Sequence, residues 1–262
     1  MLRKSLIIFG GLAFSTFAVA DDITNPFFLP KKMQLASVSS VGFDRSQQKN
    51  SASSLTAYNT LLQEELQFGL SDKLTLWGYF GNTFNKVKLS DGADFLSHQK
   101  DKNLNWGAGV SWNILDKTFK LQASFGYHQD DLYAFNGDYK FATAKIKGGY
   151  QLESMLPYIE IAEELPIGQK KDYDIDKPIY TAKVGLYQGE LESWGLDTGL
   201  RVIHDENDNT ESTFYNAEGE LSYYLTPKAT VGLYGSYTLS AKAKNQTDIY
   251  DKSIGLRFKW MF

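Results

Sequence analysis

The feature that most constrains this chain is an alternation of apolar and polar residues in segments of about ten residues or more. In residues 250–262 one face carries Ile254, Leu256, Phe258, Trp260 and Phe262, and the other carries Asp251, Ser253, Gly255, Arg257 and Lys259. The same pattern occurs in residues 104–114 and 119–128. Because successive side chains of a strand point to opposite faces, these segments are predicted to be β-strands with one apolar and one polar face.

Hydropathy then separates the possible folds. Mean hydropathy is −0.35, and no run of about 18 apolar residues, the length that indicates a membrane helix, follows residue 20. A closed barrel satisfies every backbone hydrogen bond in lipid, and its strands are apolar on one face only, so its average hydropathy is low. The predicted fold is therefore all-β, a transmembrane antiparallel up-and-down β-barrel. The chain has no cysteine, which excludes disulfides and thiolate chemistry.

The N-terminus has the features of an export signal. Arg3 and Lys4 precede an apolar stretch over residues 6–17, and small residues follow at 18–20. We expect residues 1–20 to be a cleaved signal peptide, because the apolar stretch is too short for a membrane helix. Removing Arg3 and Lys4 leaves 25 basic against 31 acidic residues, a net charge of −6, which argues against a nucleic-acid partner.

Extending the alternation along the chain predicts twelve strands, with bounds uncertain by about 2 to 4 residues. They are residues 33–43, 55–70, 74–84, 104–115, 118–128, 139–152, 155–165, 179–189, 194–204, 214–225, 229–240 and 250–262. In the first strand the apolar positions change phase between Leu35 and Val38, which favours a bulge or a shorter strand.

The predicted connections alternate in length. Short ones fall at 71–73, 116–117, 153–154, 190–193 and 226–228, and long ones at 44–54, 85–103, 129–138, 166–178, 205–213 and 241–249. Short turns face the periplasm in such barrels and long loops face outward. Residues 33–262 then form the barrel, and residues 21–32 form an N-terminal periplasmic segment that either tucks into the barrel mouth or stays disordered.

Two segments resemble known proteins. The segment 250–262, with Phe258, Trp260 and Phe262 on its apolar face, resembles the C-terminal signature of Gram-negative outer-membrane β-barrels. Residues 65–76 are similar to a strand-turn-strand of uncharacterised outer-membrane proteins of the phenol-degradation-pathway type, usually called transporters. The first resemblance implies a location in the cell outer membrane, with lipids and the barrel-assembly machinery as partners and Phe258, Trp260 and Phe262 as the assembly signal.

Tryptophans on the apolar faces are expected at the membrane surfaces, where amphipathic aromatic rings gather. These are Trp106, Trp112, Trp194 and Trp260.

Catalytic and metal sites have little support. His98, His128 and His204 are expected at outer strand ends or in loops, and Ser124 lies about 13 Å from His128 along one strand, too far for the hydrogen bond of a lipase site. The acidic runs at 172–176 and 205–209 lack the glycine and helices of a calcium-binding hand, so they are read as hydrated loop tips, with a surface cation site as the alternative. No enzyme activity, cofactor or resident metal is expected.

The inward faces are predicted to line the lumen with charges of both signs. The candidates are Lys120, Lys145, Lys147, Glu160, Glu164, Lys183, Asp197, Arg201, Glu218, Glu220 and Arg257, with Lys259 beside them. Glu160 and Glu164 are expected beside Lys145 and Lys147. Opposed charges across a pore would orient polar solutes, which predicts a narrow passive channel for small polar solutes. The alternatives are a structural barrel with surface loops and an ion-paired closed lumen, and an outer-membrane lipid hydrolase.

Overall fold

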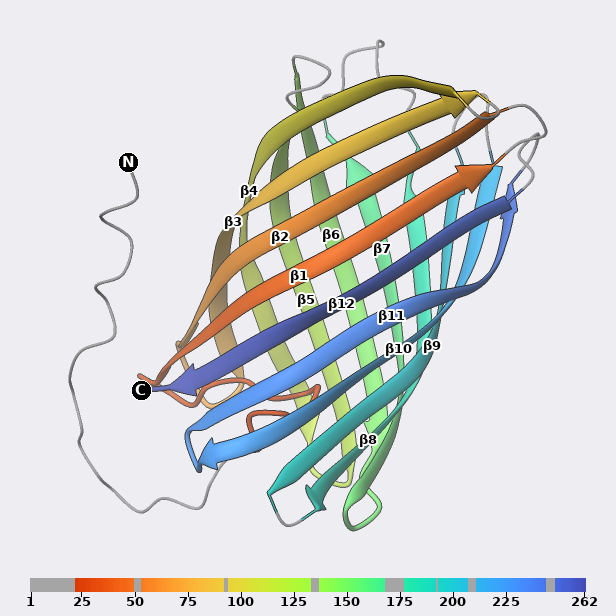
Figure 1. The fold of residues 1–262 in the computed structure, drawn as a ribbon. Coiled ribbons are helices and arrows are strands. Elements are labelled where there is room, and N and C mark those ends of the chain that lie inside the picture. The colour runs from red at the N-terminus through yellow and green to blue at the C-terminus, as the bar shows by residue number, and fades with distance from the viewer. Residues whose placement is uncertain are drawn as a thin grey trace.

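The structure, a computed structural model, describes residues 22–49, 53–91, 94–132, 137–167, 177–191, 193–206, 211–243 and 248–262. These residues form one closed antiparallel barrel of twelve strands in which each strand pairs with its sequence neighbours and β1 closes on β12 (Figure 1). The predicted fold class and strand number are therefore confirmed. Within the part of the chain that the structure describes, no helix is long and apolar enough to cross a membrane.

The strands are Leu35–Lys49 (β1), Ser53–Gly69 (β2), Leu74–Asp91 (β3), Asp94–Asp116 (β4), Phe119–Leu132 (β5), Gly137–Tyr150 (β6), Met155–Pro166 (β7), Ile179–Leu191 (β8), Trp194–Glu206 (β9), Glu211–Thr226 (β10), Ala229–Ala243 (β11) and Asp248–Met261 (β12). Residues 22–34 and Phe262 lie at the same end of the barrel, which we call the terminal end (Figure 1).

Large apolar side chains cover the outside of the barrel, in the period-two pattern that the sequence predicts. Examples are Phe43, Leu62, Phe80, Phe125, Ile161, Val184, Leu200, Leu233 and Leu256, all of them exposed. We call this surface the apolar band. An exposed apolar surface that encircles a closed sheet is suited to lipid, because water-soluble proteins rarely expose large contiguous apolar patches.

The predicted long connections are wrong in extent. β3 and β4 stay paired from Leu74 and Trp112 to Asp91 and Asp94, so residues 85–103 are strand for nearly their whole length. The other strands, except β8, also run further from the terminal end than predicted. The physical reason is that both strand faces meet water beyond the membrane. The apolar alternation then stops, although backbone pairing continues.

The expected bulge in the first strand is also wrong. β1 pairs with β2 and with β12 in continuous register, without a shift. Its outward positions are Leu35, Ser37, Ser39, Val41 and Phe43, as the exposed Phe43 and its in-register partners indicate. The apolar phase changes because two serines occupy the lipid-facing side, while Val38 points into the barrel.

Candidate functional site in the barrel lumen

Residues 22–34 enter the barrel and cross its terminal end (Figure 1). Thr24 Oγ1 lies 2.5 Å from Tyr187 Oη on β8 and 2.9 Å from Tyr224 Oη on β10. Both tyrosines also donate hydrogen bonds to the carboxylate of Asp22. A Cβ at Gly195 would lie 2.5 Å from Thr24 Oγ1, so only glycine on β9 leaves room for this approach.

The carbonyl groups of the segment are held from the other side of the lumen. Lys147 Nζ on β6 donates to the carbonyl of Pro26 at 2.7 Å. The amides of Asn113 on β4 and Gln122 on β5 donate to the carbonyl of Phe27 at 3.3 and 3.2 Å. Since a buried carbonyl needs a donor, these three side chains satisfy backbone that no strand pairs. The N-terminal segment is therefore fixed at both sides of the barrel.

The side chain of Phe27 adds an apolar anchor. It is 3% exposed and packs with Leu156, Tyr158 and Tyr187 in the one core cluster found among the described residues. The ring of Tyr158 meets Phe27 edge to face, with ring centroids 6.1 Å apart. Burying a phenylalanine side chain contributes about 1.5–3 kcal/mol, which favours the tucked segment over a disordered one. In the structure, residues 22–34 take the tucked arrangement.

Charged side chains line the inner wall from β6 to β12, and they are interleaved as ion pairs. Glu160 on β7 lies 3.2 Å from Lys147 Nζ and 4.0 Å from Lys145 Nζ. Lys147 is buried, whereas the side chain of Lys145 is 39% exposed and lines the larger lumenal cavity. Lys145 is therefore the most exposed member of this group.

A second group joins β8, β9 and β10. Lys183 Nζ lies 2.6 Å from Glu218 and 3.5 Å from Asp197, and Arg201 Nε lies 3.0 Å from Glu218. Tyr158 donates to Asp197 at 2.8 Å. Each carboxylate in this group has a cation and each buried cation has a carboxylate, as burial of charge requires.

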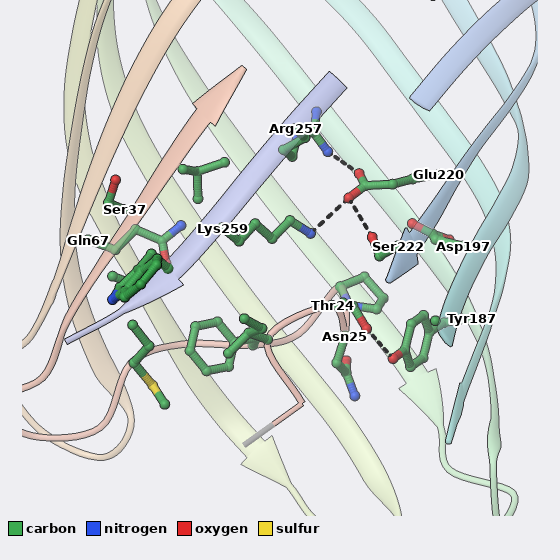
Figure 2. A pocket seen from close by; sticks show the side chains of 18 of the residues that line it. Thr24, Asn25, Ser37, Gln67, Tyr187, Asp197, Glu220, Ser222, Arg257 and Lys259 are labelled. Atoms are coloured by element: carbon green, nitrogen blue, oxygen red, sulfur yellow. Dashed lines mark hydrogen bonds and ion pairs between the residues drawn. The ribbon is translucent and has the colours of Figure 1, made fainter. Parts of the chain in front are cut away.

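The third group surrounds Glu220 and borders a cavity of about 250 Å³ beside the N-terminal segment (Figure 2). Glu220 accepts hydrogen bonds from Arg257 and Ser222, and Lys259 Nζ lies 3.1 Å from it. Figure 2 shows Thr24 and Tyr187 below this group, so the segment and the ion pairs share one cavity wall.

The wall formed by β3, β5 and β6 carries aromatic rings. Trp77 and Tyr79 stack with centroids 6.4 Å apart, and His128 lies 5.6 Å from each ring. His128 Nδ1 is 2.9 Å from Tyr79 Oη, and its Nε2 is 2.9 Å from Thr143 Oγ1. The expectation that His128 is a solvated residue at a strand end is wrong, because its ring faces inward and stacks on Phe141 at 4.7 Å.

Sequence reasoning missed this aromatic wall because inward aromatic residues break the apolar-out pattern. The one usable signal was that Trp77 and Tyr79 alternate with the outward Leu76 and Phe80, which marks two aromatic residues on the polar face.

A larger cavity of about 480 Å³ lies between the two walls. Its floor is formed by Pro26, Phe28 and Leu29 of the N-terminal segment. The rest of its lining is mainly polar and comes from opposite sides of the barrel, including Gln63, Glu65, Trp77, His128, Lys145, Glu160 and Arg201. The barrel therefore encloses polar space that ends on the N-terminal segment.

One of the predicted lumenal residues has another partner than expected. Glu164 accepts a hydrogen bond from Tyr139 at 2.6 Å instead of meeting Lys145 or Lys147, because the register places it across from Thr143. Lys120 pairs with Asp116 at the terminal end, 2.8 Å away. The role of the whole set in lining a pore stays a prediction.

The predicted interfacial tryptophans are all exposed on the outside. Trp112, Trp194 and Trp260 lie near the terminal end, whereas Trp106 lies about ten residues from the end of its strand, roughly 25 Å by strand rise and tilt. The residues of the expected assembly signal, Phe258, Trp260 and Phe262, stack along the outer face of β12.

The remaining sequence candidates offer no catalytic or metal geometry in the described chain. His204 Nδ1 bonds Thr213, and neither His128 nor His204 contacts a serine in the interactions found there. The side chain of His98, residues 172–176 and residues 207–209 lie outside the described part. No group of three or more acidic or histidine side chains able to hold a metal occurs among the described residues.

Comparison with known proteins shows similarity in fold. No family profile matches the sequence, and no curated protein matches it. An outer membrane channel from Pseudomonas putida F1 is 15% identical, with 92% of this chain and 100% of that chain aligned at a TM-score of 0.68. The translocator domain of the autotransporter NalP from Neisseria meningitidis is 12% identical, with 88% and 90% aligned at a TM-score of 0.60. This chain thus has the fold of Gram-negative outer-membrane β-barrels, which agrees with the predicted location in the outer membrane.

Proposed function

We propose that the protein is a narrow passive channel of the outer membrane for small polar solutes. The observation that carries this proposal is the polar cavity of about 480 Å³ inside the barrel, lined from opposite walls by amides, hydroxyls and partly exposed charges. A lumen that served only to fill the barrel would be packed with side chains, as in the smallest barrels. Twelve strands enclose more space than that, and here part of it stays open.

In this proposal residues 22–34 set the width of the channel at its terminal end. The segment is held by side chains of the barrel wall from β4 to β10. Solutes therefore pass beside the segment or cross only when it moves. Tyr187 and Tyr224 hold the segment through hydrogen bonds to Asp22 and Thr24. These hydrogen bonds can be removed without changing the pairing of the barrel strands.

One observation favours a structural alternative. Most lumenal charges are matched in ion pairs, and a structural barrel with a closed lumen would need all of its buried charges to be matched. Conductance separates the two functions, because only a channel conducts ions.

The test uses purified, folded protein in planar lipid bilayers. We expect small single-channel steps from the wild type and larger steps from Tyr187→Phe/Tyr224→Phe, which frees Asp22 and Thr24. The matched control is Tyr215→Phe/Tyr223→Phe, since these two tyrosines lie on the exposed outer face of β10. If neither the wild type nor the releasing variant conducts over a range of voltages and salts, the channel function is wrong and the structural one stands.

A further inference from the structure

Five cationic side chains lie on neighbouring strands on the outer face of the barrel. We call them the basic band: Arg45, Lys86, Lys88, Lys102 and Lys252. Arg45 on β1 pairs in register with Lys252 on β12 and with Tyr58 on β2. Tyr58 pairs with Lys86 on β3. Lys102 on β4 pairs with Phe84, which lies two residues before Lys86 on the same face of β3. The cations thus lie on four strands, β12, β1, β3 and β4, and Tyr58 on β2 connects the two halves of the band.

The cations point outward, because each lies on the same strand face as an exposed apolar residue. Two positions separate Lys252 from Ile254, which is 55% exposed, and Lys102 from Leu104, which is 48% exposed. Arg45 stands in the same relation to Phe43. On every strand that carries a member of the band, the outward-facing residues therefore change from apolar to cationic at one position.

That place matches the edge of a membrane. Lys252 precedes Phe262 by about ten residues, which at the rise and tilt of barrel strands is roughly 25 Å, the height of the lipid-facing surface in such barrels. The cations begin where the apolar band ends, at the end of the barrel away from residues 22–34.

Aromatic rings hold three of the cations at this edge. Arg45 and Lys88 lie over the ring of Tyr58, 5.7 and 5.4 Å from its centroid, and Lys102 lies 5.9 Å from the centroid of Phe84. A cation over an aromatic face keeps its charge and its donors available on the side away from the ring. The charges are therefore fixed in position while still able to bind an anion.

Among the side chains that the structure describes, these cations have no acidic partner on this surface. Beyond the apolar residues on the outer faces of β12 and β1 to β4, every charged side chain that the structure describes is basic. The lumen shows the opposite arrangement, because its buried cations are matched with carboxylates. Within the described residues, this row of cations at the membrane edge is therefore not matched by carboxylates.

We infer that the basic band binds the phosphate groups of phosphorylated glycolipid in the outer leaflet of the membrane. Lipid phosphates are the anions fixed at this height, and basic residues at a membrane surface attract them strongly. Five cations on four strands suit a lipid that carries more than one phosphate. The inference rests on the predicted topology, with the terminal end facing the periplasm, and is independent of channel activity.

The test measures binding of bacterial lipopolysaccharide to folded, detergent-solubilised protein in the presence of a chelator. The variant is Arg45→Gln/Lys88→Gln/Lys102→Gln, and the control is Lys73→Gln/Lys117→Gln/Lys228→Gln, which removes equal charge from turns at the terminal end. At about fivefold per cation, we expect binding to weaken on the order of 100-fold in the variant and little in the control. Heat-modifiable migration checks that both stay folded.

A second arm needs no variant. Enzymatically dephosphorylated lipopolysaccharide should bind the wild type far more weakly than the phosphorylated form. Equal binding of the two lipids would overturn the inference. An unchanged affinity in the band variant, or an equal loss in the control, would overturn it as well, the latter by showing that net charge alone is responsible.

Discussion

Ser39 on β1 donates a hydrogen bond to Glu64 on β2 on the outside of the barrel, within the apolar band. Ser37 donates to the other carboxylate oxygen at 2.5 Å. Glu64 is flanked by the exposed Leu62 and Leu66 on its own strand. An ionisable group facing lipid is costly, and here two serines supply the donors that water would otherwise give.

The first prediction follows from this contact. Ser37→Ala/Ser39→Ala should lower the free energy of unfolding in lipid vesicles by about 2–4 kcal/mol, because it leaves the carboxylate without donors. Adding Glu64→Leu should restore most of the loss. Ser40→Ala, on the inward side of the same strand, is the control, and equal loss there would show that β1 is simply sensitive to any substitution.

Lys145 provides a test of ion preference. It is the most exposed member of its ion-paired group and lines the larger cavity, so Lys145→Glu should shift the reversal potential toward cations in a salt gradient. Lys73→Glu in the turn after β2 makes the same charge change outside the lumen and should leave the potential nearly unchanged. Equal shifts would mean that surface charge, not the lumen, determines preference.

Topology can be read with single cysteines, because the chain has none of its own. Cysteines at Asp91 and Asp174 should react with an impermeant thiol reagent on intact cells, while one at Ser154 should react only after the outer membrane is opened. Asp91 ends β3 away from the terminal end, whereas Ser154 lies in the turn before β7 at that end. The reverse pattern of labelling would invert the barrel and remove the basis for a lipid site in the outer leaflet.

The resemblance of residues 250–262 to an assembly signature predicts an effect on insertion. Replacing Phe262 by Asp should reduce the heat-modifiable barrel in the outer membrane, while cleavage of the predicted signal peptide proceeds normally. Phe262 donates its backbone amide to Leu35 at 2.8 Å, and this bond does not depend on the side chain. Normal assembly of the variant would show that the aromatic side chain is not read.

The sequence by itself determined which face of each strand meets lipid. Alternation in segments such as 250–262 is a local property with a period of two residues, so it predicts the strand number and the outward residues without knowledge of pairing. It stopped being informative where both faces meet water, which is why residues 85–103 were predicted as a loop although they continue β3 and β4.

Only the tertiary structure decided which side chains meet across strands. Register and barrel closure depend on contacts far apart in the chain, and they placed Glu164 beside Tyr139 and His128 among aromatic rings. They also seated residues 22–34 in the lumen, because Thr24 finds Tyr187 and Tyr224 only when β8 and β10 stand on one wall of a closed barrel. No pattern in residues 22–34 contains that information, since the partners of its polar groups lie on strands that must first fold around it.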